Sequence, residues 1–143
     1  DVLFAKITPC MENGKAAVVP CIPSGFGFGS TEFIVMRGIL AGPAFTYELA
    51  RLQSFRVHAQ RSMSGATGRQ RVRTDSLRAF KMPIPPLGLL SRFENVVCPW
   101  LDLVGSLGKA SRALATSRDL LLPRLVSGDL TVAAAERELE NAA

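Results

Sequence analysis

The proline-rich segment Met82-Pro-Ile-Pro-Pro-Leu87 constrains the architecture of this chain more than any other feature. Proline fixes φ and has no backbone N–H, so a run of this kind cannot continue a helix or lie in the middle of a sheet. A stiff linker is therefore expected over residues 82–88. It separates residues 1–81 from residues 89–143, and these two parts differ in their apolar pattern.

The second part has heptad spacing. Apolar residues recur at alternating steps of four and three, which predicts a long helix with a narrow stripe suited to a partner helix. Ser111 and Arg118 fill the two other positions of the stripe, whose apolar members are Phe93, Val97, Trp100, Val104, Leu107, Leu114, Leu121 and Leu125. The same pattern is also compatible with an internal core helix of this domain.

The limits of this helix are expected at about 89 and 122, with a weaker helical tail over residues 130–139. Pro99 is expected to bend the helix or to mark its true start, because proline interrupts the hydrogen bonding of a helix interior. Pro123 and Gly128 are expected to close it.

The first part contains short apolar and β-branched runs between turn residues. Strands are expected at 2–8, 16–19 and 31–37, and a helix is expected at 44–56. Asp75 is expected to be the N-cap of a short segment that ends near Phe80. The order of these elements predicts an α/β (α+β) fold, with an irregular β-sheet followed by a long coiled-coil-type helix.

Glycines alternate with phenylalanines in the run Gly25-Phe-Gly-Phe-Gly29. It lacks the preceding strand, the following helix and the acidic residue of a dinucleotide-binding loop. The run is interpreted as a loop with two packed phenylalanines.

The basic charge of the chain lies in one block. The formal net charge is +5, but residues 51–81 hold eight Lys and Arg against Asp75 alone, while the segments on either side are each slightly acidic. A concentrated block that is mostly arginine is typical of a surface that faces phosphate groups.

Within this block, Ser64-Gly-Ala-Thr-Gly-Arg-Gln-Arg-Val-Arg73 is the most informative stretch. Glycines let backbone N–H groups approach an anion, hydroxyls add donors, and arginine matches both phosphate and guanine edges. A solvated basic loop is the alternative, and a Walker A loop is excluded because no Gly-Lys-Ser/Thr follows. The arginines are expected mostly on phosphate, with Gln70 or one arginine as candidates for a base edge. The candidate DNA contacts are Ser64, Thr67, Arg69, Gln70, Arg71 and Arg73, with Lys6 and Lys15 as weaker candidates.

No catalytic or cofactor site is expected. His58 is the single histidine, and nothing places it as a base beside Ser62 or Ser64. The three cysteines lack metal-ligand spacing and are odd in number, which favours a reducing cytoplasm over a disulfide framework. The sequence contains no apolar run of the roughly 18–20 residues that would span a bilayer.

Five blocks of the chain, in order, resemble a known family. Residues 1–15, 29–37 and 65–72 resemble conserved stretches in the target-recognition domains of type I restriction–modification specificity subunits. The linker at 84–87 and the segment Arg118-Asp-Leu-Leu-Leu-Pro-Arg-Leu-Val-Ser-Gly-Asp-Leu130 resemble the end of the same unit, where a conserved helix follows the linker.

The resemblance implies a non-catalytic subunit that reads one half of a split site in double-stranded DNA. It also implies adenine methyltransferase (M) subunits and a translocating restriction (R) subunit as partners. The conserved helix is then expected to pair with a second conserved helix, either in the same chain or in a homodimer.

Two departures from the family pattern keep other interpretations open. Gly88-Leu-Leu90 replaces the usual residues after the linker, and only one recognition block and one conserved helix are present, with the upstream part of that block missing, so a fragment is expected. The alternatives are the C-terminal specificity region of a fused type IIG restriction-methyltransferase and a protein-interaction module without DNA binding.

Overall fold

The computed structural model describes residues 1–19, 22, 24–133, 136–137 and 140. It divides into two compact units, residues 1–99 (unit 1) and residues 100–143 (unit 2). Among the described residues, no helix is long and apolar enough to cross a membrane.

Unit 1 contains a three-stranded antiparallel sheet, which confirms the expected strands in shorter form. Strands β1 (Val2–Ala5), β2 (Ala16–Val18) and β3 (Phe33–Met36) lie in the order β2-β1-β3. β1 is the central strand, and three of its four residues are buried, whereas no residue of β2 or β3 is. In the register, Leu3 lies opposite Ala17 on one side and Val35 on the other.

The helix expected at 44–56 is two helices, α1 (Pro43–Arg51) and α2 (Gln53–Arg61). Leu52 separates them with φ −57° and ψ 126°, a conformation that no helix interior adopts. A third helix, α3 (Thr74–Arg78), begins after Arg73, so the prediction of Asp75 as N-cap is wrong. Asp75 lies in the first turn instead, where the positive end of the helix dipole favours a carboxylate.

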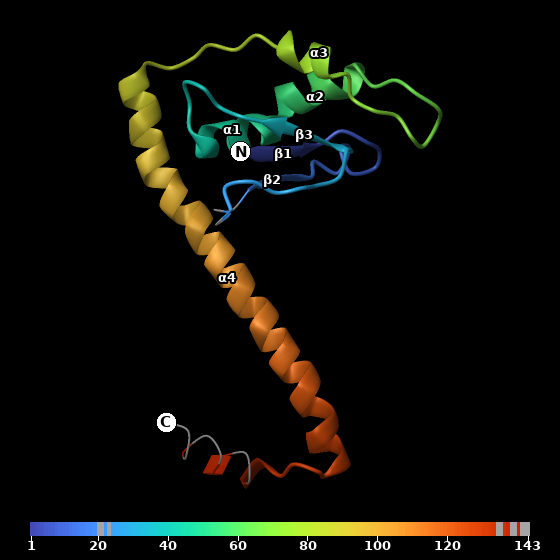
Figure 1. Ribbon diagram of the computed structural model, residues 1–143, viewed down its shortest axis with the longest axis vertical. Helices are drawn as coiled ribbons and strands as arrows, with labels where there is room; N and C mark the ends of the chain where they lie inside the picture. The colour runs from blue at the N-terminus through green and yellow to red at the C-terminus, as the bar shows by residue number, and fades with distance from the viewer. Residues whose placement is uncertain (20–21, 23, 134–135, 138–139, 141–143) are drawn as a thin grey trace. The chain divides into compact units, whose positions relative to one another are not determined.

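The core of unit 1 lies between the sheet and helices α1 and α2 (Figure 1). Phe55 is its centre, since its ring meets those of Phe4 at 5.7 Å and Phe80 at 5.1 Å in edge-to-face geometry. Other buried members are Val2, Met11, Ala50, Ala59 and Val72. Because side chains alternate along a strand, Leu3 and Val35 lie on the face away from this core. There they line a groove with Phe26 and Phe28 of the glycine-rich loop, whose rings pack edge to face at 6.1 Å.

The expected long helix is confirmed as α4 (Leu87–Ser127), which begins and ends somewhat beyond the expected limits. The helix runs through Pro99 and Pro123, so Pro99 does not mark its start and Pro123 does not close it. It ends before Gly128, whose φ of 80° is the left-handed conformation that terminates many helices. The tail expected over 130–139 lies partly outside the described residues.

The first turns of α4 belong to unit 1 and supply the acceptor for the first amides of α1. The Glu94 carboxylate accepts hydrogen bonds from the backbone amides of Ala44 and Phe45, at 3.0 and 2.8 Å. The rings of Phe45 and Phe93 meet edge to face at 6.2 Å, and Leu90 is buried. These contacts fix the direction in which the chain leaves the linker within unit 1.

Candidate nucleic-acid interface

The arginine-rich stretch forms a closed loop between α2 and α3. Ser64 and Arg71 exchange backbone hydrogen bonds of 3.1 and 2.9 Å, so the two sides of the loop pair like a short hairpin. Gly65 and Gly68 have φ of 124° and 79°, conformations that L residues rarely adopt, and Arg69 N–H bonds the carbonyl of Ala66 at 3.0 Å. The glycines therefore serve to turn the loop tightly.

The base of this loop is joined to the sheet. Val72 N–H donates to the carbonyl of Lys6 at 2.8 Å, and Thr8 N–H donates to the carbonyl of Gln70 at 3.1 Å. The Val72 side chain is buried in the core. The loop thus has a fixed root and an exposed tip.

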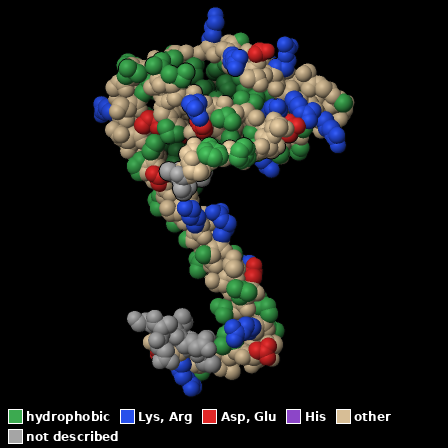
Figure 2. Space-filling model, viewed as in Figure 1, with side chains coloured by type: hydrophobic (Ala, Val, Ile, Leu, Met, Phe, Trp, Pro, Cys, Tyr) green, Lys and Arg blue, Asp and Glu red, His purple; other side chains and the backbone are tan. Residues whose placement is uncertain are grey.

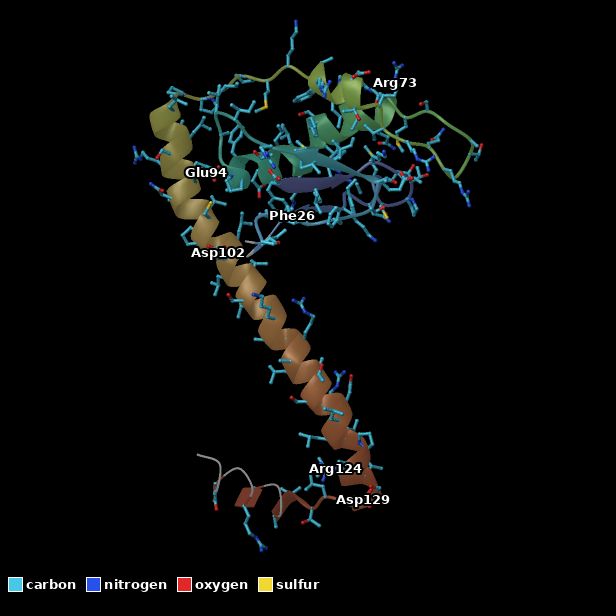
Figure 3. The ribbon with its side chains drawn as sticks, viewed as in Figure 1. Phe26, Arg73, Glu94, Asp102, Arg124 and Asp129 are labelled. Carbon is cyan, nitrogen blue, oxygen red and sulfur yellow. The ribbon has the colours of Figure 1, made fainter. Side chains whose placement is uncertain are left out.

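Most candidate contacts are on the solvent side of this loop. Ser64, Thr67, Arg69, Arg71 and Arg73 are exposed, whereas Gln70 is half-buried. Figure 2 shows Lys and Arg side chains gathered at the end of unit 1 that carries this loop, with acidic side chains among them. Arg73 lies where the loop meets α3 (Figure 3).

Among the described residues, the side chains of Arg69 and Arg73 take part in no hydrogen bond or ion pair, so both guanidinium groups are available to an anion.

The two candidate lysines lie at different places. Lys6 is next to the root of the loop, since its carbonyl accepts from Val72 and its N–H donates to Glu32. Lys15 lies at the start of β2, where its carbonyl accepts from Ala5 N–H and its amide donates to Cys10. The structure therefore brings Lys6, but not Lys15, into backbone contact with the arginine loop.

Arg71 differs from Arg69 and Arg73 because its guanidinium forms an ion pair with Glu32. Its Nη2 lies 2.7 Å from Oε1 of Glu32, and its Nε lies 3.1 and 3.0 Å from the two carboxylate oxygens. Hydrogen bonding from Arg71 lowers the pKa of Glu32, and the same bond raises the pKa of Arg71. Sequence reasoning missed Glu32, since nothing local connects residues 39 positions apart.

Other members of the basic block are also held by unit 1. Arg56 donates to the carbonyl of Glu12 at 2.9 Å, and its guanidinium lies against Gly14. Arg51 lies over the Tyr47 ring, 5.4 Å from its centroid. Some arginines of the basic block therefore contact unit 1, whereas the sequence had indicated that the whole block faces phosphate.

His58 and Ser62 are each bound to backbone. Nε2 of His58 lies 2.8 Å from the carbonyl of Ser76, and its ring packs on Phe80 at 5.3 Å. The Ser62 hydroxyl donates to the carbonyl of Ala59 at 2.7 Å. Within the part of the chain that the structure describes, no three His, Cys, Asp or Glu side chains gather as a metal site would require.

Comparison with known proteins finds similarity to two specificity subunits of type I restriction enzymes. The chain is 34% identical over 88 residues to the type I restriction enzyme EcoEI specificity subunit of Escherichia coli, across 60% of this chain and 15% of that protein. It is 31% identical over 121 residues to the EcoAI specificity subunit of the same organism, across 83% of this chain and 20% of that protein. No family model and no solved structure matches the chain. The chain thus spans a fifth or less of the length of the relatives it matches, and it is similar to part of these two type I restriction enzyme specificity subunits.

Proposed function

We propose that this segment reads one half-site of double-stranded DNA for a type I restriction–modification complex, with the arginine loop as its contact surface. The observation that carries the proposal is the pair of exposed, unengaged guanidinium groups of Arg69 and Arg73 on a loop whose root is fixed to the sheet. A fixed root lowers the ordering cost of binding, because less of the loop backbone has to be ordered when DNA binds.

The candidate residues have different roles in this proposal. Arg69 and Arg73 bind phosphates, and Ser64 and Thr67 donate hydroxyl hydrogen bonds beside them. Gln70 is the candidate for an adenine edge, which an amide can meet with a donor and an acceptor. Lys6 and Lys15 add weaker attraction to the DNA backbone.

We further propose that α4 holds this unit in the complex by pairing with a second conserved helix, in the same chain or in a homodimer. The stripe residues of unit 2 support this, since Trp100, Val104, Leu107 and Leu114 are all more than half exposed. The proposed partners are the M and R subunits in the cytoplasm, with catalysis left to them. This division of labour is that of a specificity subunit.

The test is DNA binding by the full protein chain assembled with its methyltransferase subunits. Arg69→Ala and Arg73→Ala are each expected to weaken binding about tenfold and to lower the slope of log K against log salt by about 0.9. Arg112→Ala on α4 is the matched control and should leave both quantities unchanged. Wild-type affinity and salt slope in both loop variants would remove the arginine loop from the interface.

A further inference from the structure

The pair formed by Arg71 and Glu32 has the geometry of a structural clamp. Nε and Nη2 of the guanidinium engage both oxygens of the carboxylate within 3.1 Å, a planar arrangement that is stronger and more specific than a single contact. Nη1 of the same guanidinium also reaches the carbonyl of Arg69 at 3.4 Å. One side chain therefore ties the loop tip to the residue before β3.

Backbone hydrogen bonds place this clamp at the root of the loop. Lys6 donates its N–H to the carbonyl of Glu32 at 3.0 Å and accepts from Val72 N–H at 2.8 Å, so the backbones of Glu32 and Val72 are both bonded to Lys6. Arg71 in turn exchanges two hydrogen bonds with Ser64 on the far side of the loop. The clamp is thus continuous with the pairing that closes the loop.

We infer that Arg71 and Glu32 are positioning residues that hold the arginine loop in its DNA-binding shape, and that Arg71 does not itself contact DNA. A phosphate would have to displace a carboxylate that already fills the guanidinium fork. Once displaced, that carboxylate would stand unpaired beside the DNA backbone and repel it. The inference rests on the proposed function and assigns the phosphate contacts to Arg69 and Arg73.

Glu32→Gln is the decisive variant, because it keeps the shape of the side chain and removes its charge. If the clamp positions the loop, Glu32→Gln weakens DNA binding about tenfold in the assembled protein, although an acidic group has been removed. If Arg71 instead binds phosphate, the substitution frees it, so binding tightens and the salt slope steepens by about 0.9. Asp1→Asn is the matched control, since Asp1 forms another bidentate arginine–carboxylate pair of unit 1, with Arg37, and should leave binding unchanged.

A double-mutant cycle and hydrogen exchange complete the test. Arg71→Gln is expected to weaken binding with the salt slope retained, and the double variant is expected to lose no more than either single variant. Without DNA, the amides of Ser64 and Arg71 should exchange faster in each variant. Tighter or unchanged binding by Glu32→Gln, or wild-type exchange of these amides, overturns the inference. A wild-type protein that binds no DNA would overturn the proposed function, whereas the exchange experiment would still decide whether the clamp holds the loop.

Discussion

The carboxylate of Glu94 caps α1 at a distance of 2.8 Å from the amide of Phe45, although 49 residues separate the two in the chain. The second oxygen accepts from Ala44 and also from the Cys98 thiol at 3.2 Å. Unpaired amides at a helix N-terminus need acceptors, and here the acceptor comes from the helix that follows the linker. One side chain therefore stabilises α1 and fastens the start of α4 within unit 1.

Glu94→Ala is expected to lower the free energy of unfolding of unit 1 by about 1 kcal/mol, the usual cost of losing an N-cap acceptor. The change is measured by urea unfolding, monitored by far-ultraviolet circular dichroism. Glu94→Gln keeps one acceptor oxygen and should lose less. Equal stability of all three proteins would contradict a capping role.

Gly42→Ala is expected to destabilise unit 1 through the same contact. A Cβ on Gly42 would lie 2.4 Å from the Glu94 carboxyl group, so the cap would have to move. Gly105→Ala is the matched control, because Gly105 lies in α4 with nothing within 4 Å of its Cβ position. That substitution should stabilise α4 by about 0.8 kcal/mol, the helix propensity difference. Opposite signs of the two effects in thermal unfolding are the expected result.

Acid is expected to release the Glu32 clamp. The pKa of Glu32 is lowered by hydrogen bonding from Arg71, so the folded state binds its proton less readily than the unfolded state does. The contribution of this pair is therefore complete above the ordinary carboxyl pKa of 4.5 and is lost as pH falls through the lowered value. An NMR titration of the Glu32 carboxyl should return to the ordinary midpoint in Arg71→Gln. The same midpoint in both proteins would mean that Arg71 does not lower the pKa of Glu32.

Phe55→Ala is expected to cost about 3–5 kcal/mol of stability, because it removes the ring that joins Phe4 to Phe80 and leaves a cavity. Phe28→Ala is the control, since the Phe28 side chain is 97% exposed and its loss should stay within about 0.5 kcal/mol. Denaturant unfolding of the two variants compares them directly. Similar losses in both would mean that the core of unit 1 is not centred on Phe55.

Leu107→Gln combined with Leu114→Gln is expected to weaken pairing of α4, because each leucine loses roughly 1.5–3 kcal/mol of burial in the paired state. Thr116→Gln, on the opposite side of the helix, is the control. Sedimentation and helix content at several protein concentrations report the effect. A loss of helix content that depends on protein concentration indicates a homodimer, and a loss that does not depend on it indicates pairing within one chain. If the double variant sediments and folds like the wild-type protein, the stripe takes part in no pairing.

The elements that sequence predicted well are those with local signals. The heptad spacing from Phe93 to Leu125 predicted α4, and short apolar and β-branched runs between turn residues predicted the three strands, because each signal lies within one element. The helix break at Leu52 had no such signal. The extended ψ of Leu52 lets α1 and α2 pack separately against the sheet. Tertiary packing here overrides the local helix propensity of the sequence.

The predicted helix boundaries at Pro99 and Pro123 were wrong for a related reason. A proline within a helix costs about 3 kcal/mol, which argued for a boundary at Pro99 and at Pro123. In the structure α4 continues through both, with apolar heptad positions on either side of each.

The arginine-rich stretch was predicted to be a loop and the structure confirms a loop there, but its internal organisation was not predictable. Composition showed an excess of arginine, yet it could not show that Arg71 faces Glu32 or that Arg56 faces the turn at Glu12. Such pairs depend on how distant segments meet across the sheet. The sequence therefore indicated how many positive side chains are present, and the structure shows which of them already have partners within unit 1.

The fixed root and open tip of the arginine loop have a consequence for the proposed function. The root is held by main-chain hydrogen bonds, by the buried Val72 side chain and by the Arg71–Glu32 pair. The exposed side chains of Ala66, Thr67 and Arg69 can therefore be exchanged without disturbing the fold, whereas Gly68, with φ of 79°, is needed for the turn. Under the proposed function, selection for a new DNA target acts on positions that carry little of the folding energy.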